Sequence, residues 1–407
     1  MARRLRIVSV VRSLPNPDDP SGGIFVLNRL AAMAEVADVT VVQPVPYLPG
    51  VKPLPHWART KSRRLAGLEI LHAPMLYVPG VLKSADGMWL ARAIRPVVTG
   101  LHRTAPLDAL DAHFGYPEGA GCAAIAQRIG VPLFITIRGF ENEYVSRPLV
   151  GARMLAAIRG ATGCIAVSHS LEALATRHGV APERVRVIHN AIDGSLFRFG
   201  DAQAARAALG LGAAPLVVSV GHLISRKRHH VLIDAFAELK RVYPTAVLAI
   251  IGARSFEPTY PDKLLRQCRE LNVSADVRFL GNMPPRDVAS WLQAADLFAL
   301  ATAREGCCNA VLEALGVGVP VVTTPAGDNA YFVKDQENGF IVPIDDAGSL
   351  SKAMVRALQS AWNRPAISGE LQRRVGAWSG VAERVIDFMF ERLDAHATRH
   401  SSAAAAC

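Results

Sequence analysis

The sequence predicts an α/β protein with two doubly wound domains. Short apolar segments typical of strands alternate with helical patterns along most of the chain, which indicates parallel sheets covered by helices on both faces. At 407 residues, the chain is too long for one ordinary hydrophobic core and suits two domains of similar size. Half of the residues are hydrophobic, so each domain can bury a core of its own.

The first series of elements begins near the N-terminus. Residues 5–11 form a nearly continuous apolar run that we expect to be a strand, and a proline-rich loop follows. Ser21-Gly22-Gly23 then opens a helix that should run to about Ala37. Further strands of this half are expected at residues 39–43, 69–72, 107–111, 132–137, 163–167 and 186–188.

The second series follows a linker at residues 189–193. Its strands are expected at residues 216–220, 246–251, 277–280, 297–300 and 319–323. Later, residues 381–393 show the periodicity of an amphipathic helix. We therefore divide the chain into two domains, a C-terminal helix and a tail that we expect to be disordered, with boundaries at residues 1–195, 196–378, 379–398 and 399–407.

The charge balance is strongly basic, with a formal net charge of +10. Such an excess suits nucleic acid, an anionic membrane surface or anionic substrates. The basic residues are dispersed, and the sequence has neither a zinc-knuckle spacing nor the aromatic motif of an RNA-recognition domain. These observations disfavour a nucleic-acid partner.

The cysteines favour a cytoplasmic location, because they form no C-x-x-C pair and no disulfide framework. The N-terminal apolar run ends at Arg12 and Pro15 without the cleavage pattern of a signal peptide. No segment approaches the ~20 apolar residues of a membrane span. The six cysteines are Cys122, Cys164, Cys268, Cys307, Cys308 and Cys407.

Two glutamates eight residues apart are the most informative feature of the chain. Glu305 precedes a glycine in an expected loop, and Glu313 lies within an apolar helix that leads into a strand. Eight helical residues span ~12 Å, about the length of a nucleoside diphosphate joined to a sugar. The N-terminus of this helix, near Cys308 and Asn309, could hold a diphosphate. The alternative is a structural helix with one glutamate on its solvent face.

Residues 304–315 resemble the E-x7-E motif of the retaining glycosyltransferases of family 4, also called group 1. Many members read E-G-W-P-N and then L-E-A-L, whereas this chain has Cys307-Cys308 in place of Trp-Pro. The linker at residues 189–193 is similar to the I-P-N-G-V-D linker of that family, with His189 and Ala191 substituted. The resemblance implies that Glu305 contacts the donor sugar and that Glu313 binds the nucleotide ribose.

The resemblance also implies a GT-B fold. Two Rossmann-like domains would face each other across a cleft, and the C-terminal helix would cross back to the first domain. The first domain would bind the acceptor, and the second would bind the nucleotide sugar. Ligands of such sheets bind beyond the carboxyl ends of the strands.

A basic turn follows the first strand of the second domain. Residues 221–227 are similar to the family motif G-R-L-x-x-x-K-G, which implies that Lys227 contacts the donor phosphates. His222 replaces the usual arginine, and Arg226 could restore its charge. The alternative is a solvated charge run, because Arg228, His229 and His230 continue the basic stretch.

Two strand ends of the first domain carry the candidate acceptor residues. His113 ends one strand, and residues 136–141 resemble the family pattern T-x-H-G-x-D, with Arg138 in place of the histidine. An arginine cannot act as a base near neutral pH. Arg138 could bind acceptor or donor oxygens, or pair with Glu141 or Glu143. In retaining enzymes of this type the donor phosphate is thought to take the acceptor proton, so a protein base is dispensable.

The chain shows no D-x-D motif and no histidine or cysteine cluster with metal-ligand spacing. Because Lys227 and a helix N-terminus can replace Mg²⁺ at a diphosphate, we expect no metal and no other cofactor. The stretch at residues 44–64 combines prolines, aromatic residues and basic residues. It suits peripheral association with an anionic membrane or a lipid-linked acceptor, or else it is a variable surface loop.

The leading interpretation is a retaining, metal-independent glycosyltransferase that uses a UDP- or GDP-sugar and a glycan or lipid-linked acceptor in bacterial cell-envelope or exopolysaccharide biosynthesis. The alternatives are a GT-B sugar-nucleotide epimerase, a phosphorylase, or a catalytically silent binding subunit.

The expected site residues fall into three overlapping groups. The catalytic group is Glu305, Lys227, Arg138 and His113, and the acceptor-binding group is His113, Arg138 and Glu141. The donor-binding group is Gly22, Gly23, His222, Arg226, Lys227, Gly281, Met283, Glu305, Gly306, Cys307, Cys308, Asn309, Ala310 and Glu313.

Overall fold

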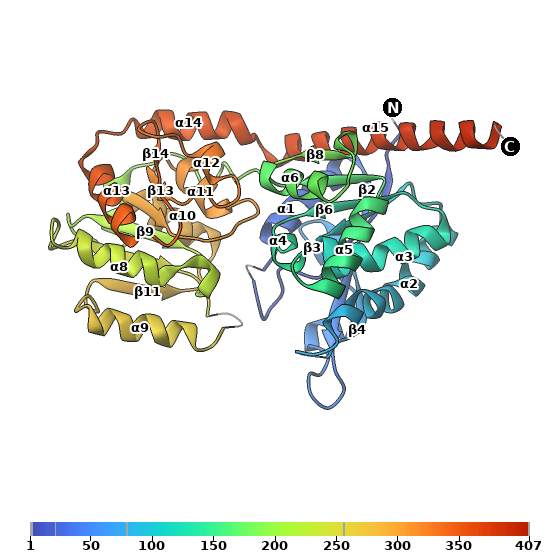
Figure 1. The fold of residues 1–407 in the computed structure, drawn as a ribbon, viewed down its shortest axis with the longest axis horizontal. Coiled ribbons are helices and arrows are strands. Elements are labelled where there is room, and N and C mark those ends of the chain that lie inside the picture. The colour runs from blue at the N-terminus through green and yellow to red at the C-terminus, as the bar shows by residue number, and fades with distance from the viewer. Residues whose placement is uncertain (1–2, 21, 79, 255–256, 406–407) are drawn as a thin grey trace. The chain divides into compact units, whose positions relative to one another are not determined.

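The computed structural model describes residues 3–20, 22–78, 80–254 and 257–405, with side chains as far as residue 398. The chain forms two compact units. Unit 1 comprises Met1–Asn190 and Trp378–Cys407, and unit 2 comprises Ala191–Ala377. Each unit contains a mainly parallel sheet between helices, which confirms the predicted fold class (Figure 1). The sequence predicts domain boundaries after residues 195 and 378, whereas the units divide after Asn190 and Ala377.

Unit 1 contains an eight-stranded sheet in the order β3-β4-β2-β1-β5-β6-β7-β8. Of the described strands in this unit, only β3 runs antiparallel to its neighbour. The strands are β1 (Arg6–Val10), β2 (Asp38–Tyr47), β3 (Ser62–Leu65), β4 (Leu68–Leu76), β5 (Ala109–His113), β6 (Leu133–Ile137), β7 (Gly163–Ala166) and β8 (Val185–Val187). The helices are α1 (Ile24–Val36), α2 (Asp86–Thr104), α3 (Ala120–Ile129), α4 (Glu141–Tyr144), α5 (Pro148–Gly160), α6 (His169–Arg177) and α15 (Trp378–Ala405).

Unit 2 contains a six-stranded parallel sheet in the order β11-β10-β9-β12-β13-β14. Its strands are β9 (Leu216–Val220), β10 (Val247–Ile251), β11 (Val277–Gly281), β12 (Leu297–Leu300), β13 (Val321–Thr323) and β14 (Gly339–Ile341). Its helices are α7 (Ala202–Ala208), α8 (His229–Leu239), α9 (Tyr260–Glu270), α10 (Pro285–Ala294), α11 (Asn309–Gly316), α12 (Asn329–Phe332), α13 (Ala347–Gln359) and α14 (Arg364–Val375).

The central strands are continuous apolar runs because both faces of each sheet are covered. Val217 and Val218 are adjacent in β9, yet both are fully buried and belong to different core clusters. A strand with one solvated face would instead alternate between apolar and polar residues. The carboxyl ends of β9 and β12 are neighbours in the sheet, and the loops after these strands carry the residues described below.

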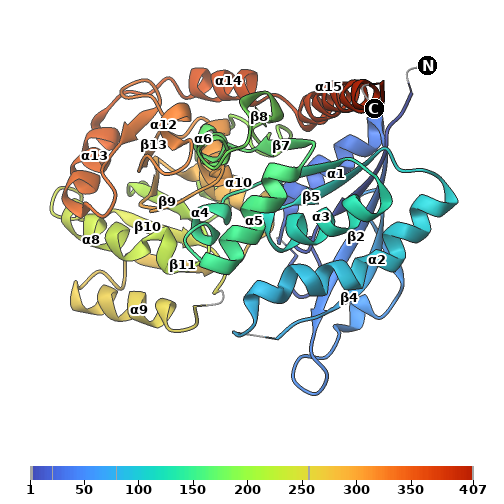
Figure 2. The ribbon, with the colours of Figure 1, turned by 45° about the vertical axis from the view of Figure 1, so that its right-hand side comes forward.

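The C-terminal helix packs on unit 1, which confirms the predicted return to the first domain. α15 lies against α1 (Figure 2). Its Phe388 ring packs edge-on to Phe134 of β6, and its Glu391 pairs with Arg186 of β8 at 2.9 Å. α15 extends to Ala405, whereas the sequence predicts disorder from residue 399, and the last two residues of that tail lie outside the described residues. None of the described helices is long and apolar enough to cross a membrane.

The stretch at residues 44–64 is more ordered than a variable surface loop. β2 continues through Pro44 and Pro46 to Tyr47, and beyond Val42 it pairs only with β4. Prolines are tolerated at such an edge because the missing N–H groups cost no ladder hydrogen bond. Arg63 lies in β3 and donates hydrogen bonds to Pro15 and Gln43, so this basic residue is engaged within unit 1.

Candidate functional site

The turn after β9 positions Lys227. Gly221 follows the strand, and a Cβ atom at this position would lie 3.1 Å from Cε of Lys227, so the glycine makes room for the lysine side chain. The turn is fixed from the side by Glu257, whose carboxylate accepts the backbone N–H of Ser225 at 2.9 Å and its hydroxyl at 3.1 Å. This arrangement folds Lys227 back towards the end of the strand.

The loop after β12 brings Glu305 to the same place. Lys227 Nζ donates to Oε1 of Glu305 at 2.7 Å, and the hydroxyl of Thr302 donates to the same oxygen at 2.7 Å. Arg226 approaches the other carboxylate oxygen at 3.5 Å and donates to the carbonyl oxygen of Arg304 at 2.8 Å. Lys227, Glu305, Arg226 and Thr302 form the set that we call the lysine–glutamate cluster.

The cluster holds Glu305 in its ionised form. Its side chain is only 7% exposed, and burial alone would raise its pKa. The charges of Lys227 and Arg226, together with the hydrogen bonds from Lys227 and Thr302, outweigh burial and lower the pKa of Glu305. The site therefore contains a buried carboxylate next to two cations, where a second anion could share those cations.

A glycine after β13 supports the Glu305 loop. Gly327 has a φ of +62°, and a Cβ atom there would lie 2.6 Å from the carbonyl oxygen of Gly306 and 3.1 Å from Cβ of Glu305. Any larger residue would push the loop away. Gly306 is itself buried, so its role in this structure is to bring the backbone close to Gly327.

Glu313 lies in helix α11, which follows the Glu305 loop. Its neighbours Val311 and Leu312 are buried in the core, while Glu313 is partly buried, and its carboxyl group receives no hydrogen bond from the described residues. Burial raises its pKa to about 8, and the charge of Lys227 acts in the opposite direction. The positive charge of Lys227 favours the ionised form of both Glu305 and Glu313. At Glu305 this effect contributes to a lowered pKa, whereas at Glu313 burial outweighs it.

The N-terminus of α11 is formed by the residues that replace Trp-Pro of the family motif. Cys308 stands directly before the helix and is 6% exposed, and burial raises the pKa of its thiol to about 12. None of the five described cysteines forms a disulfide. Asn309 and Ala310 occupy the first turn, where a helix presents amide N–H groups without internal partners.

The remaining donor-site predictions in unit 2 differ in their placement. His222 is exposed, and its carbonyl oxygen accepts a hydrogen bond from Nε2 of the buried His229 at 3.2 Å. Gly281 ends β11 and Met283 follows it, and this strand is separated from β9 by β10. Met283 packs against the core of the unit, so the structure does not place it in the lysine–glutamate cluster.

In unit 1, Arg138 and His113 are in contact across two neighbouring strand ends. Arg138 Nη2 lies 3.0 Å from Nδ1 of His113, its Nε donates to the same nitrogen at 3.3 Å, and its Nη1 donates to Asn190 at 3.4 Å. On the other side of the ring, Nε2 of His113 lies 3.0 Å from Asp111. Arg138 can only donate, so Nδ1 must be the acceptor and the ring proton belongs on Nε2.

His113 is a neutral, fully buried residue, and its predicted contact with the acceptor stays a prediction. Its exposed fraction is 0%, and burial lowers its pKa to about 4, with Arg138 acting in the same direction and Asp111 opposing. Burial alone would raise the pKa of Asp111, but His113, Arg29 and Ser9 lower it. His113 is therefore a positioning residue that orients Arg138.

Glu141 has a structural role, and its predicted contact with the acceptor stays a prediction. It is fully buried, and its carboxylate accepts backbone N–H groups from Gly115 at 2.8 Å, Arg138 at 3.0 Å and Gly139 at 2.7 Å. It does not pair with the guanidinium group of Arg138. Instead, it ties together the loops after β5 and β6, which fixes the backbone from which Arg138 extends.

The glycine pair before α1 is required by its own loop. A Cβ atom at Gly22 would lie 2.2 Å from the carboxylate of Asp19, and one at Gly23, whose φ is +67°, would lie 2.1 Å from the carbonyl oxygen of Ser13. These contacts give both glycines a packing role, and they leave the predicted donor contact untested. Ser21, which precedes the pair, lies outside the described residues.

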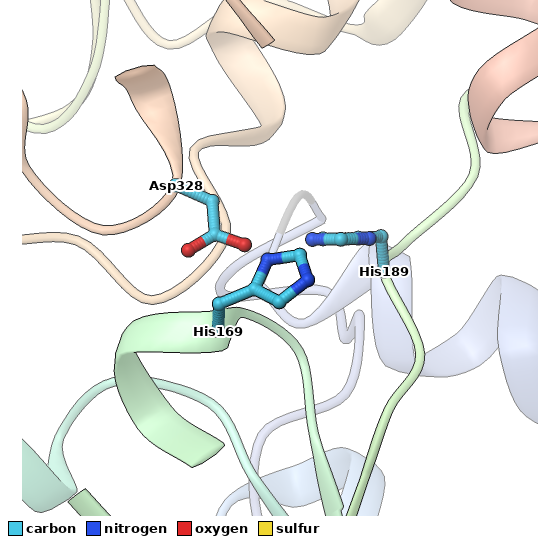
Figure 3. A group of neighbouring side chains, drawn as sticks. All are labelled: His169, His189 and Asp328. Carbon is cyan, nitrogen blue, oxygen red and sulfur yellow. The ribbon is translucent and has the colours of Figure 1, made fainter. Parts of the chain in front are cut away.

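Several contributing residues were not predicted from the sequence. Thr302 and Glu257 support the lysine–glutamate cluster, and Asp111 and Asn190 support Arg138. His169 begins α6, and its ring lies 5.2 Å from that of His189, centroid to centroid. Figure 3 labels both rings. The figure also labels Asp328, which stands before α12 of unit 2.

Family models match most of the chain. The model described as Glycosyl transferases group 1 matches residues 182–375, and the model described as Glycosyltransferase Family 4 matches residues 92–196. A D-inositol 3-phosphate glycosyltransferase of Catenulispora acidiphila is 26% identical over 94% of this chain and 94% of that protein.

Solved structures share the fold. Sucrose-phosphate synthase from Thermosynechococcus elongatus has a TM-score of 0.79 at 19% identity, covering 97% of this chain and 100% of that chain. Anabaena HepE in complex with UDP and glucose has a TM-score of 0.74 at 20% identity, covering 94% of this chain and 99% of that chain.

Proposed function

Because the chain belongs to the group 1, family 4-like glycosyltransferases with the GT-B fold, we propose that it transfers a sugar from a UDP- or GDP-sugar with retention of configuration and without a metal. The observation that carries this proposal is the contact between Lys227 and Glu305 at the end of the unit 2 sheet, beside the helix that carries Glu313. Two partly buried cations, Lys227 and Arg226, and the partly buried carboxyl group of Glu313 suit the two ends of a nucleotide sugar.

In this proposal Lys227 stabilises the departing diphosphate. An ammonium group has three donors, and Glu305 occupies one of them, so the others can reach phosphate oxygens. Arg226 adds a second positive charge, and the N-terminus of α11 adds oriented amide groups. Charge stabilisation of this kind acts on the bond to the leaving group, where negative charge develops in the transition state.

Glu305 and Glu313 would bind the other parts of the donor. Glu305 remains ionised beside the diphosphate cations, where it can face the sugar as positive charge develops at the anomeric carbon. The carboxyl group of Glu313 can accept hydrogen bonds from a ligand, because the described residues donate none to it. The hydroxyl groups of a ribose are suitable donors for this carboxylate.

The acceptor would be bound by unit 1 with Arg138 as its principal contact. Transfer breaks the bond between the anomeric carbon and the diphosphate oxygen and forms a bond from the same carbon to an acceptor hydroxyl oxygen. We propose that the hydroxyl proton passes to the departing diphosphate, because neither Arg138 nor the buried His113 can accept it.

The acceptor class proposed first is a glycan or lipid-linked sugar of bacterial cell-envelope or exopolysaccharide biosynthesis. The names of two similar proteins include an inositol phosphate and a sucrose phosphate, so small phosphorylated acceptors belong in the same panel. No observation favours epimerisation, phosphorolysis or a silent binding role over transfer.

A panel of nucleotide sugars tests the donor assignment. A ligand at 100 times its Kd adds ~2.7 kcal/mol to the free energy of unfolding, so the correct donor should raise the melting temperature by several degrees. We expect a UDP- or GDP-sugar to give the largest shift, and we expect Glu313→Gln to reduce it. If no nucleotide sugar shifts the melting temperature of the wild type, the donor assignment is wrong.

Activity should not depend on a divalent metal. Lys227 and Arg226 already supply two positive charges at the carboxylate where the diphosphate would arrive. We therefore expect full transfer activity after treatment with EDTA and no gain on adding Mg²⁺. Loss of activity in EDTA with recovery in Mg²⁺ would contradict the metal-free proposal.

Donor affinity should depend on pH through Glu313. The carboxyl group has a pKa of about 8 in the free protein and should bind ribose best when ionised, so binding near neutral pH releases a proton. The Kd for the nucleotide should fall as pH rises from 6 to 8 and then level off. Glu313→Gln should raise the Kd about tenfold at pH 8 and remove the pH dependence. A pH-independent wild type would refute this role.

The raised pKa of Glu313 also predicts how the stability of the unliganded protein depends on pH. The pKa of Glu313 is raised in the folded state from an ordinary value of 4.5 to about 8, so the folded protein binds the proton more tightly than the unfolded chain. Stability from this group is therefore present below pH 4.5 and is lost as pH rises towards 8. Glu313→Gln should raise the melting temperature, most of all above pH 8.

A further inference from the structure

A small basic cavity in unit 1 lies apart from the residues assigned above. It has a volume of about 160 Å³, equivalent to the liquid volume of about five water molecules. The cavity lies where α15 packs beside the loop after α5 and the turn before β8. Its lining consists of Gly160, Ala161, Thr162, Arg184, Arg392, Ala395 and His396.

Arg392 is the buried charge of this cavity. Its side chain extends from α15 and is 7% exposed, and its Nη1 donates to the carbonyl oxygen of Glu183 at 3.2 Å. Its Nε is buried and has no hydrogen-bond partner among the described residues. A buried guanidinium group with an unsatisfied donor is costly unless an acceptor, preferably an anion, is bound next to it.

The other polar side chains at the cavity also offer donors. Arg184 donates to the carbonyl oxygen of Ala161 at 3.2 Å, which holds its guanidinium group at the wall. The Thr162 hydroxyl oxygen accepts the backbone N–H of Leu133 at 3.3 Å, so its own proton can be donated elsewhere. Among the described residues that line the cavity, none carries a carboxylate. Its lining therefore combines fixed positive charge with hydrogen-bond donors.

We infer that the cavity formed by Thr162, Arg184 and Arg392 binds a phosphate group, either as the free ion or as the monoester of a small molecule. Guanidinium groups match the geometry of phosphate oxygens and remain charged at every physiological pH. The small volume suits a tetrahedral oxyanion better than a nucleotide. The site is independent of the donor-binding proposal because it contains none of the residues of the lysine–glutamate cluster.

A bound phosphate would tie the C-terminal helix to the body of unit 1. Arg392 comes from α15, whereas Arg184 lies directly before β8 and Thr162 directly before β7. An anion held by all three would join Arg184 and Arg392, which are more than 200 residues apart in the sequence. Binding should therefore stabilise the attachment of α15.

Thermal unfolding of the full chain tests this inference, with inorganic phosphate and sodium chloride compared at equal ionic strength. Phosphate should raise the melting temperature on the order of 5 °C when it exceeds its Kd about 100-fold. Arg392→Gln should abolish the phosphate-specific shift, and Arg184→Gln should reduce it. Arg384→Gln is the matched control, because it removes the same charge from an exposed position of α15.

Phosphate could also bind the donor site, so Lys227→Ala is included. A shift that persists in Lys227→Ala and disappears in Arg392→Gln supports the cavity as the binding site. A shift that is lost in Lys227→Ala but unchanged in Arg392→Gln and Arg184→Gln would place the ion in the donor site and overturn the inference. Equal melting temperatures in phosphate and chloride for the wild type would also overturn it. Glycerol phosphate, tested in the same way, distinguishes a monoester site from one for the free ion.

Discussion

Replacing Lys227 with alanine is expected to lower kcat/KM by a factor on the order of 10². The ammonium group is the cation closest to Glu305, at 2.7 Å, and we propose that it neutralises the diphosphate as the bond to the sugar breaks. Removing one such group from a preorganised site typically costs 10²–10³ in rate. Most of the loss should appear in kcat, because the leaving-group charge develops only in the transition state.

The matched control for this experiment is Lys263→Ala, which removes an exposed lysine from α9 of the same unit. Its activity should equal that of the wild type. Lys227→Ala also leaves Glu305 with Arg226 and Thr302 as its remaining partners, so the melting temperature of the variant must be measured. A folded Lys227→Ala protein with normal kcat/KM would contradict the proposed role of the lysine.

Replacing Arg138 should slow sugar transfer, because it should weaken binding and orientation of the acceptor. Its guanidinium group uses Nε and Nη2 towards His113 and Nη1 towards Asn190, and a lysine cannot reproduce this planar fork. Arg138→Lys should lower kcat/KM for the acceptor by a factor of about 10 to 100, with a larger rise in acceptor KM than in donor KM. Arg128→Lys, at an exposed position of α3, is the matched control.

Arg138→His separates positioning from a decayed catalytic centre, because histidine is the residue that the family pattern has at this position. If Arg138 orients the acceptor, the histidine variant should be impaired like Arg138→Lys. His113 and Asp111 are arranged around an arginine, and a shorter imidazole ring would lose these contacts. A gain in activity with histidine would instead indicate that the native site had lost its catalytic group.

The strands were predictable where burial on both faces produces an apolar run. Residues 5–11 and 216–220 are examples, and their strands β1 and β9 occupy the middle of the two sheets. β3 and β14 were missed for different reasons. β3 is short, polar and antiparallel at an edge, and β14 has only three residues next to a turn. Neither pattern differs from that of a loop when the sequence is considered alone.

Only those residues of the candidate donor site that belong to sequence motifs were predictable. Lys227 and Glu305 are 78 residues apart, and no periodicity links them, yet both belong to recognisable segments that follow adjacent strands. Thr302 could have been found as a hydroxyl residue three positions before Glu305 at a strand end. Glu257 could not, because it contacts Ser225 through the folding of a loop without a motif.

In unit 1, the position of a residue at a strand end did not predict how exposed its side chain is. His113 and Glu141 follow or end strands, where ligand-binding residues gather, but both side chains turn into the protein. Glu141 binds three backbone N–H groups, and His113 is enclosed by Asp111 and Arg138. Such contacts form between residues that only the folded chain brings together, so they leave no periodic pattern in the sequence.

The most direct test of the proposed reaction is the anomeric configuration of the product, measured by proton NMR. The purified chain would receive an α-linked UDP- or GDP-sugar, an acceptor from the panel and EDTA, and the configuration would be read from the anomeric proton of the new glycosidic bond. We predict an α-linked product in the wild type, and no product above background in Glu305→Gln, which retains the size of the side chain but removes its charge. A β-linked product, or a requirement for added metal, would contradict the proposed retaining and metal-independent transfer.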